Sequence, residues 1–249
     1  MNKKLLLVFI ALLFIGFTVK IDTQASISNG KTVTITKDSE DITGDGKVDQ
    51  IVLTGVKIAS EKYKNLVINI TDSKKAHAII HLPDGCNPIL QYFDVNHDGI
   101  KDIFGSVYDS KSGEKGHQIV YTAKNLKPLN IDLPAPLVLD SHFINGYKAN
   151  VKVITTGNNY IFDLKQRKTY YEKLGIFYHG KLNEPTELMV HDYTSLKPVQ
   201  VGEQTGLKGR QKVTGVSESD TIGYVESTWL FDHSKWKLVN VVVLKKYNQ

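Results

Sequence analysis

The sequence contains a single cysteine, Cys86, and only two methionines and two tryptophans among its 249 residues. One cysteine excludes an intramolecular disulfide framework and a cysteine-rich zinc module. The excess of charge is also small, with 31 Lys and Arg against 26 Asp and Glu, and the basic residues are dispersed. The sequence therefore predicts no nucleic-acid partner. Hydrophobic residues make up 41% of the chain, a content that excludes wholesale disorder.

Recognisable catalytic motifs are missing as well. The segment Gly215-Val-Ser217-Glu-Ser219 lacks the final glycine of a nucleophile elbow, and neither a P-loop nor a dinucleotide fingerprint occurs. His77 and His81 have the spacing of a zinc pair on a helix, but their surroundings favour a strand. On a strand the two rings would stand about 13 Å apart, too far to share one metal. The sequence predicts no catalytic residue and no organic cofactor.

The N-terminus carries the features of a signal peptide. Lys3 and Lys4 precede an apolar run from Leu5 to Phe17, and Thr23-Gln24-Ala25 offers small residues at a cleavage site. The apolar run is shorter than the roughly 20 residues that span a bilayer. Residues 1–25 are therefore predicted to be removed, and the protein to be secreted or held in the cell envelope. Contact with a membrane is expected only if this segment stays uncleaved.

The rest of the chain is predicted to be all-β. Short runs of β-branched and aromatic residues, bounded by Gly, Asn, Asp, Ser or Pro, are typical of strands and turns. The runs are 32–36, 50–57, 66–70, 76–82, 103–108, 118–122, 149–155, 160–164, 222–231 and 237–244. Residues 165–174 are the best helix candidate, and residues 232–235 resemble a hairpin loop. Residues 83–88 are predicted to be a turn, and the glycines at 202, 206 and 209 to lie in a surface loop.

A domain boundary is predicted at Pro134-Ala135-Pro136. Before it, one acidic pattern occurs twice, and after it the pattern is lost. The predicted division is a signal peptide at 1–25, two repeats at 26–133 and a C-terminal β region at 134–249. The C-terminal region could also continue the architecture of the repeats.

The acidic pattern is the most specific motif in the sequence. Residues 41–49 and 94–102 both fit D-x-[TN]-x-D-G-x-x-D, and the copies are 53 residues apart. Ca²⁺ prefers six to eight oxygen ligands, which side chains at positions 1, 3, 5 and 9 and a carbonyl at position 7 can supply. An EF-hand is excluded because position 12 is Val52 or Gly105 instead of glutamate, and β-formers follow.

The two loops, with Phe104-Gly105 after the second, resemble the FG-GAP/VCBS repeats of integrin-α-type β-propellers. The resemblance covers roughly residues 31–133 and implies propeller-like blades with calcium loops. It implies ten Ca²⁺ ligands: Asp41, Thr43, Asp45, Lys47 (carbonyl) and Asp49, then Asp94, Asn96, Asp98, Ile100 (carbonyl) and Asp102. Two loops are fewer than a full propeller needs, so four blades or an open two-blade unit with a separate β domain both remain possible.

Together these features predict an exported calcium-binding β-propeller-like module without catalytic activity. Its expected partner is a macromolecule or a cell-surface polymer of the envelope. The alternative is a secreted hydrolase that acts on envelope or environmental polymers, with a pocket built from acidic residues and histidines of the C-terminal region. Candidate acids for this pocket include Glu184, Glu187, Glu203, Glu218 and Asp220.

Overall fold

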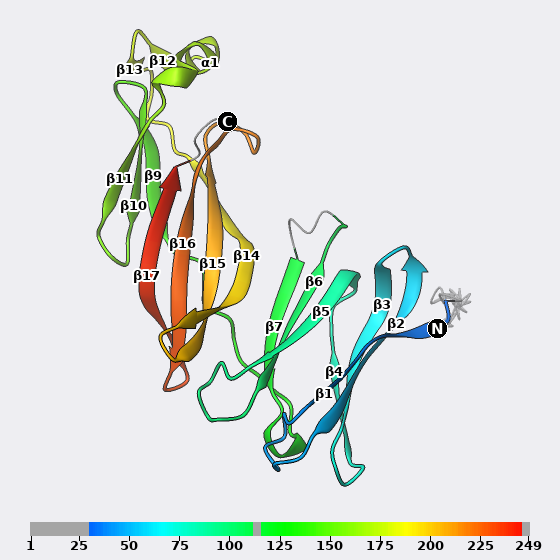
Figure 1. Ribbon diagram of the computed structural model, residues 1–249. Helices are drawn as coiled ribbons and strands as arrows, with labels where there is room; N and C mark the ends of the chain where they lie inside the picture. The colour runs from blue at the N-terminus through cyan, green and yellow to red at the C-terminus, as the bar shows by residue number, and fades with distance from the viewer. Residues whose placement is uncertain (1–29, 112–115, 246–249) are drawn as a thin grey trace, which may run out of the picture.

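The computed structural model describes residues 30–111 and 116–245, and the predicted signal peptide lies outside them. Figure 1 shows two groups of sheets that follow one another along the chain. The prediction of an all-β protein is confirmed, because strands dominate the described residues and helical turns occupy only short segments. Within the same ranges no helix has the length and apolar character needed to cross a bilayer.

The N-terminal group is one antiparallel sheet made of two meanders. The strands are β1 (Thr32–Glu40), β2 (Asp49–Ala59), β3 (Lys62–Thr71), β4 (His77–His81), β5 (Gly85–Phe93), β6 (Asp102–Tyr108), β7 (Gly116–Thr122) and β8 (Leu129–Asn130). Strands β1 to β4 pair in sequence order, and so do β5 to β8. Strand pairing between the meanders is limited, in the described ranges, to two residue pairs between β3 and β5.

The core of this sheet follows from alternation in the sequence. On β2, Ile51 and Leu53 are fully buried while their neighbours are partly or wholly exposed. Alternate residues of a strand point to opposite faces, so this pattern buries one face of the sheet. These residues form a cluster with Leu66, Ile68, Ile70, Ile103 and Val107.

The C-terminal group contains three further sheets. The three-stranded sheet is formed by β9 (Leu139–Ile144), β10 (Lys148–Val153) and β11 (Asn159–Asp163), and the small hairpin by β12 (Phe177–Tyr178) and β13 (Lys181–Leu182). The four-stranded sheet is formed by β14 (Met189–Val201), β15 (Gln204–Thr214), β16 (Thr221–Asp232) and β17 (Lys235–Lys245). Helical turns are η1 (Lys124–Leu126), η2 (Lys165–Arg167) and α1 (Lys168–Lys173).

The two groups share a core cluster. It combines Phe104 and Val120 of the N-terminal sheet with Leu196 and Leu207 of β14 and β15. The connection between the groups is held by the buried side chain of Gln211, which accepts from the Leu137 N–H at 2.8 Å and donates to the Leu137 carbonyl at 3.1 Å. The Gln211 side chain therefore satisfies both the backbone N–H and the backbone carbonyl of Leu137.

Several local predictions are confirmed. Residues 165–174 contain η2 and α1, and ten of the predicted runs overlap observed strands. Asp232 pairs with Lys235 across a two-residue turn in which His233 and Ser234 both have positive φ, the geometry of a tight hairpin. His77 and His81 lie at the two ends of β4, both exposed.

Two local predictions are wrong. The predicted turn at 83–88 contains the start of β5, and the predicted surface loop is strand β15 at Gly206 and Gly209, although Gly202 does lie in the exposed turn before it. Gly206 and Gly209 are both buried in the sheet, and a residue of a neighbouring strand leaves no room for a Cβ at either position. A Cβ on Gly209 would lie 2.1 Å from the ring of Tyr193, and one on Gly206 would lie 2.2 Å from the Trp229 carbonyl oxygen. Close packing, and not turn formation, accounts for these glycines.

Candidate functional site

The two acidic loops occupy equivalent positions in the two meanders. The first joins β1 to β2, with Glu40 paired to Asp49, and the second joins β5 to β6, with Phe93 paired to Asp102. Strands follow both loops directly, as the sequence predicts. The 53-residue repeat of the sequence therefore corresponds to a repeat of the structure, in which each loop joins the first two strands of a meander.

The last aspartate of each loop is buried and binds the loop backbone. Asp49 Oδ2 accepts from the N–H groups of Ile42 and Thr43 at 2.9 and 3.0 Å. Asp102 Oδ2 accepts from those of Val95 and Asn96 at 2.9 and 3.1 Å. The position-3 side chains, Thr43 and Asn96, also donate to these two carboxylates. This shared pattern closes each loop on itself.

The first aspartate of each loop also turns inward. Asp41 accepts from the N–H groups of Gly44 and Gly46 through its two oxygens. Asp94 does the same with Asp98 and Gly99. Glycine is required at position 6, since Gly46 and Gly99 have φ of +77° and +84°.

The remaining predicted ligands have other partners. Asp45 accepts from the Lys47 N–H and from Ser73 Oγ, the latter at 2.8 Å. Asp98 accepts from the Ile100 N–H, and the ammonium group of Lys124 lies 3.1 Å from its Oδ2. Within residues 30–111 and 116–245, no three acidic, histidine or cysteine side chains form a group that could hold a metal ion.

The chemistry of the donors still suits calcium. All predicted ligands offer oxygen, and in the second loop Asp94 and Asp98 lie close enough to influence the charge of Asp102. Burial raises the pKa of Asp102 to about 6. The hydrogen bonds from the Val95 and Asn96 N–H groups act in the opposite direction, and the negative charges of Asp98 and Asp94 also raise the pKa. A nearby cation would favour the charged form of these carboxylates. Calcium binding at the two loops remains a prediction.

The loops contact each other and the C-terminal sheet. The side chain of Ile100 lies over Gly44, where a Cβ would come within 2.3 Å of its Cδ1. His97 has a positive φ of 60°, and its Nε2 lies 2.9 Å from the Thr205 carbonyl oxygen at the start of β15. The second loop therefore helps to join the two groups of sheets.

A groove of about 860 Å³ is lined by Asp109 and Gly116, beside the ends of β6 and β7, and by residues of β14, β15, β16 and the β15–β16 loop. We define it by six charged residues that line it, Asp109, Asp192, Lys197, Arg210, Lys212 and Glu218. Strand β14 has two register shifts here, between Val190 and Tyr193 and between Tyr193 and Ser195. Such bulges redirect side chains and are frequent beside functional sites.

Part of the charge in the groove is fixed by internal contacts. Arg210 donates to Glu226 Oε1 through Nε at 2.8 Å and Nη2 at 2.6 Å, and its guanidinium lies over the ring of Tyr224. Burial would raise the pKa of Glu226, but the hydrogen bonds and charges of Arg210 and Lys208 hold it below its usual value. Glu226 therefore stays ionised. Its negative charge compensates the positive charge of Arg210, and the guanidinium is held in one position.

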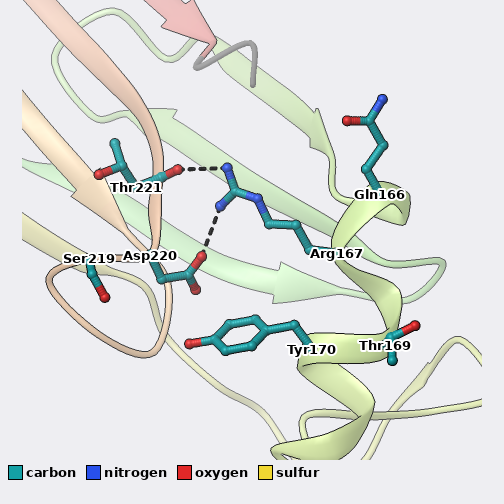
Figure 2. A pocket seen from close by; sticks show the side chains of 7 residues that line it. All are labelled: Gln166, Arg167, Thr169, Tyr170, Ser219, Asp220 and Thr221. Atoms are coloured by element: carbon teal, nitrogen blue, oxygen red, sulfur yellow. Dashed lines mark hydrogen bonds and ion pairs between the residues drawn. The ribbon is translucent and has the colours of Figure 1, made fainter. Parts of the chain in front are cut away.

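A second pocket, of about 500 Å³, lies beside η2 and α1. Figure 2 shows Arg167 reaching from η2 to Asp220 and to the carbonyl of Thr221, both at 2.8 Å. Tyr171 donates to the same carboxylate, whose side chain is only 4% exposed. The polar groups at the base of this pocket are thus satisfied by each other, and they lock the helical segment to the β15–β16 loop.

Sequence reasoning missed both the groove and this lock. Strand β14 was not predicted, and Asp220 and Glu218 were expected only as possible acids of a catalytic pair. Asp220 is instead bound to Arg167 and Tyr171, and Glu218 lines the groove. The alternation of Lys208, Arg210 and Lys212 was the one available signal, because alternate strand residues share a face.

Comparisons with known proteins assign no activity. The family model described as the YybI C-terminal domain matches residues 137–244. The chain is 29% identical over 198 residues to the uncharacterized protein YybI of Bacillus subtilis (strain 168), covering 75% of each chain. No solved structure shows a significant match. The family match lies outside the acidic loops, so the resemblance to FG-GAP/VCBS repeats remains a prediction from their motif.

Proposed function

We propose that this protein is an exported, non-catalytic β module that binds a polymer of the cell envelope in the groove. The observation that carries the proposal is the groove itself, an open polar site of about 860 Å³ built by bulged strand β14 and its neighbours. Its size lies within the range of binding sites for small molecules or short polymer segments. The predicted signal peptide supports a location where envelope polymers are accessible.

The groove also offers the side chains that polymer recognition requires. Lys197 and Lys212 can donate hydrogen bonds, Asp192 and Glu218 can accept them, and Tyr224 contributes an aromatic ring beside the Arg210 guanidinium. Aromatic faces together with fixed polar groups orient a ligand and exclude water from part of its surface.

Charge reversal in the groove should weaken binding to cell-wall sacculi. We expect Lys197→Glu combined with Lys212→Glu to reduce co-sedimentation with purified sacculi about tenfold. The two substitutions remove two hydrogen-bond donors from the groove and introduce carboxylates that repel anionic groups of the polymer. The matched control is Lys235→Glu combined with Lys237→Glu, on β17, outside the residues that line the groove. Equal binding by both double variants and the unmodified protein would place the polymer site elsewhere.

In the same proposal, the two meanders are propeller-like blades braced by Ca²⁺. Each meander has four antiparallel strands in sequence order, with an acidic loop between its first and second strands. The ligands would be the ten residues that the motif predicts. To complete the coordination, Asp45 would release Ser73 and Asp98 would release Lys124.

Calorimetry after removal of divalent ions should detect about two Ca²⁺ sites. At tenfold excess over Kd, each site should stabilise the fold by about 1.4 kcal/mol, measurable as a rise in Tm. The variant Asp41→Asn combined with Asp94→Asn should lose most of this response. Absence of both binding heat and a Tm shift in the unmodified protein would eliminate the calcium part of the proposal.

A secreted hydrolase is the second candidate function. It is favoured by one observation, that Asp109, His191, Asp192 and Glu218 line the same groove. A pair of carboxylates on either side of a bound polymer could act as acid and base. Release of soluble fragments from sacculi, abolished by Asp192→Asn, would establish this alternative; unchanged sacculi after prolonged incubation would support the non-catalytic function.

A further inference from the structure

The groove carries charges of both signs that are free to meet a ligand. Lys197 and Asp192 are exposed on β14 and form no ion pair with any other residue in the described ranges. Lys212 donates to the Glu218 backbone carbonyl, which leaves the carboxylate of Glu218 available. Two cationic and two anionic groups therefore face the same space.

The arrangement does not suit a purely anionic or purely cationic polymer. The described residues that line the groove include three basic and three acidic side chains, so neither sign dominates. One of the basic side chains, Arg210, is already compensated by Glu226, which further limits the attraction for a polyanion. A ligand with a single sign of charge would meet repulsion as well as attraction, which lowers its affinity relative to a mixed ligand.

We propose that the groove binds a segment of envelope polymer that carries amino and anionic groups together. Its ammonium groups would meet Asp192 and Glu218, and its carboxylates or phosphates would meet Lys197 and Lys212. This inference rests on the proposed function and specifies the ligand class for the same site. The bulges of β14 supply the geometric basis, since they lie on either side of Tyr193, one including Asp192 and the other Thr194, and change the alternation of the strand there.

The inference can be tested by fluorescence anisotropy with four labelled probes of equal length. The probes are an alternating Lys-Glu dodecapeptide, oligoglutamate, oligolysine and an uncharged dextran oligomer. The alternating peptide should bind at least fivefold more tightly than each of the others, and its affinity should fall as salt rises. Asp192→Asn and Lys197→Gln should each weaken its binding about fivefold, whereas Asp232→Asn and Lys235→Gln at the β16–β17 turn should not.

The outcomes separate this inference from the function on which it rests. Preference for oligoglutamate, oligolysine or dextran would overturn the mixed-charge ligand class. Failure of all four probes to bind, together with intact co-sedimentation with sacculi, would also overturn it while leaving the proposed function in place. Loss of sacculus binding as well would remove the proposed function itself. Tight binding of the alternating peptide that both groove variants weaken would support the inference.

Discussion

Replacement of Asp220 by alanine should lower the free energy of unfolding by about 3–5 kcal/mol. The Asp220 carboxylate is the shared partner of Arg167, Tyr171 and the Val216 N–H. Its loss would leave the guanidinium of Arg167, whose side chain is 18% exposed, without its counter-ion, and the hydroxyl of the fully buried Tyr171 without this acceptor. Breaking a buried pair by removing one partner is costly because the other charge stays desolvated.

The measurement for Asp220→Ala is urea unfolding followed by circular dichroism. The matched control is Asp140→Ala, which removes an aspartate whose side chain is 55% exposed and whose carboxylate, among the described residues, pairs with His142. Its effect should stay within about 1 kcal/mol, as for other exposed ion pairs. A loss below 1 kcal/mol for Asp220→Ala would show that the lock between η2 and the β15–β16 loop contributes little.

Replacement of Asp49 by alanine should destabilise the protein by about 2–4 kcal/mol, the cost of leaving two buried backbone donors unsatisfied. Asp49 is fully buried, and it accepts from Ile42 and Thr43, which are themselves buried. Water cannot easily replace the carboxylate at this position. The first loop should therefore lose its closed form in the protein without a bound cation.

The measurement for Asp49→Ala is the midpoint of thermal unfolding in the presence of a chelator. Asp45→Ala serves as the control in the same loop, because the Asp45 side chain is exposed and its donors can turn to water. We expect the control to cost less than about 1 kcal/mol. Equal effects of the two variants would contradict the view that the buried carboxylate closes the loop.

Local patterns predicted much of the fold. The β-branched runs located ten strands, because a strand with one buried and one exposed face has an alternating pattern of apolar and polar residues. Strand β15 was missed because Gly206 and Gly209 resemble loop residues, and their role depends on Trp229 and Tyr193 in other strands. Strand β5 was missed for a similar reason, since Pro83 and Pro88 flank a segment with a strong turn signature.

The candidate sites were predicted less completely. The acidic loops could be found because their ligands lie within nine consecutive residues, and their internal hydrogen bonds follow the repeat. The groove could not be found, since it combines Asp109, Asp192 and Arg210 from three distant strands or loops. The contact between Arg167 and Asp220 likewise joins residues 53 positions apart, and no local pattern encodes it.

Hydrogen–deuterium exchange with soluble fragments of cell-wall sacculi tests the central claim most directly. The account predicts slower exchange in residues 190–197 of β14 and 208–212 of β15, with little change in β9 to β11. Protection confined to another surface, or no protection at fragment concentrations that saturate binding, would contradict the assignment of the groove as the polymer site.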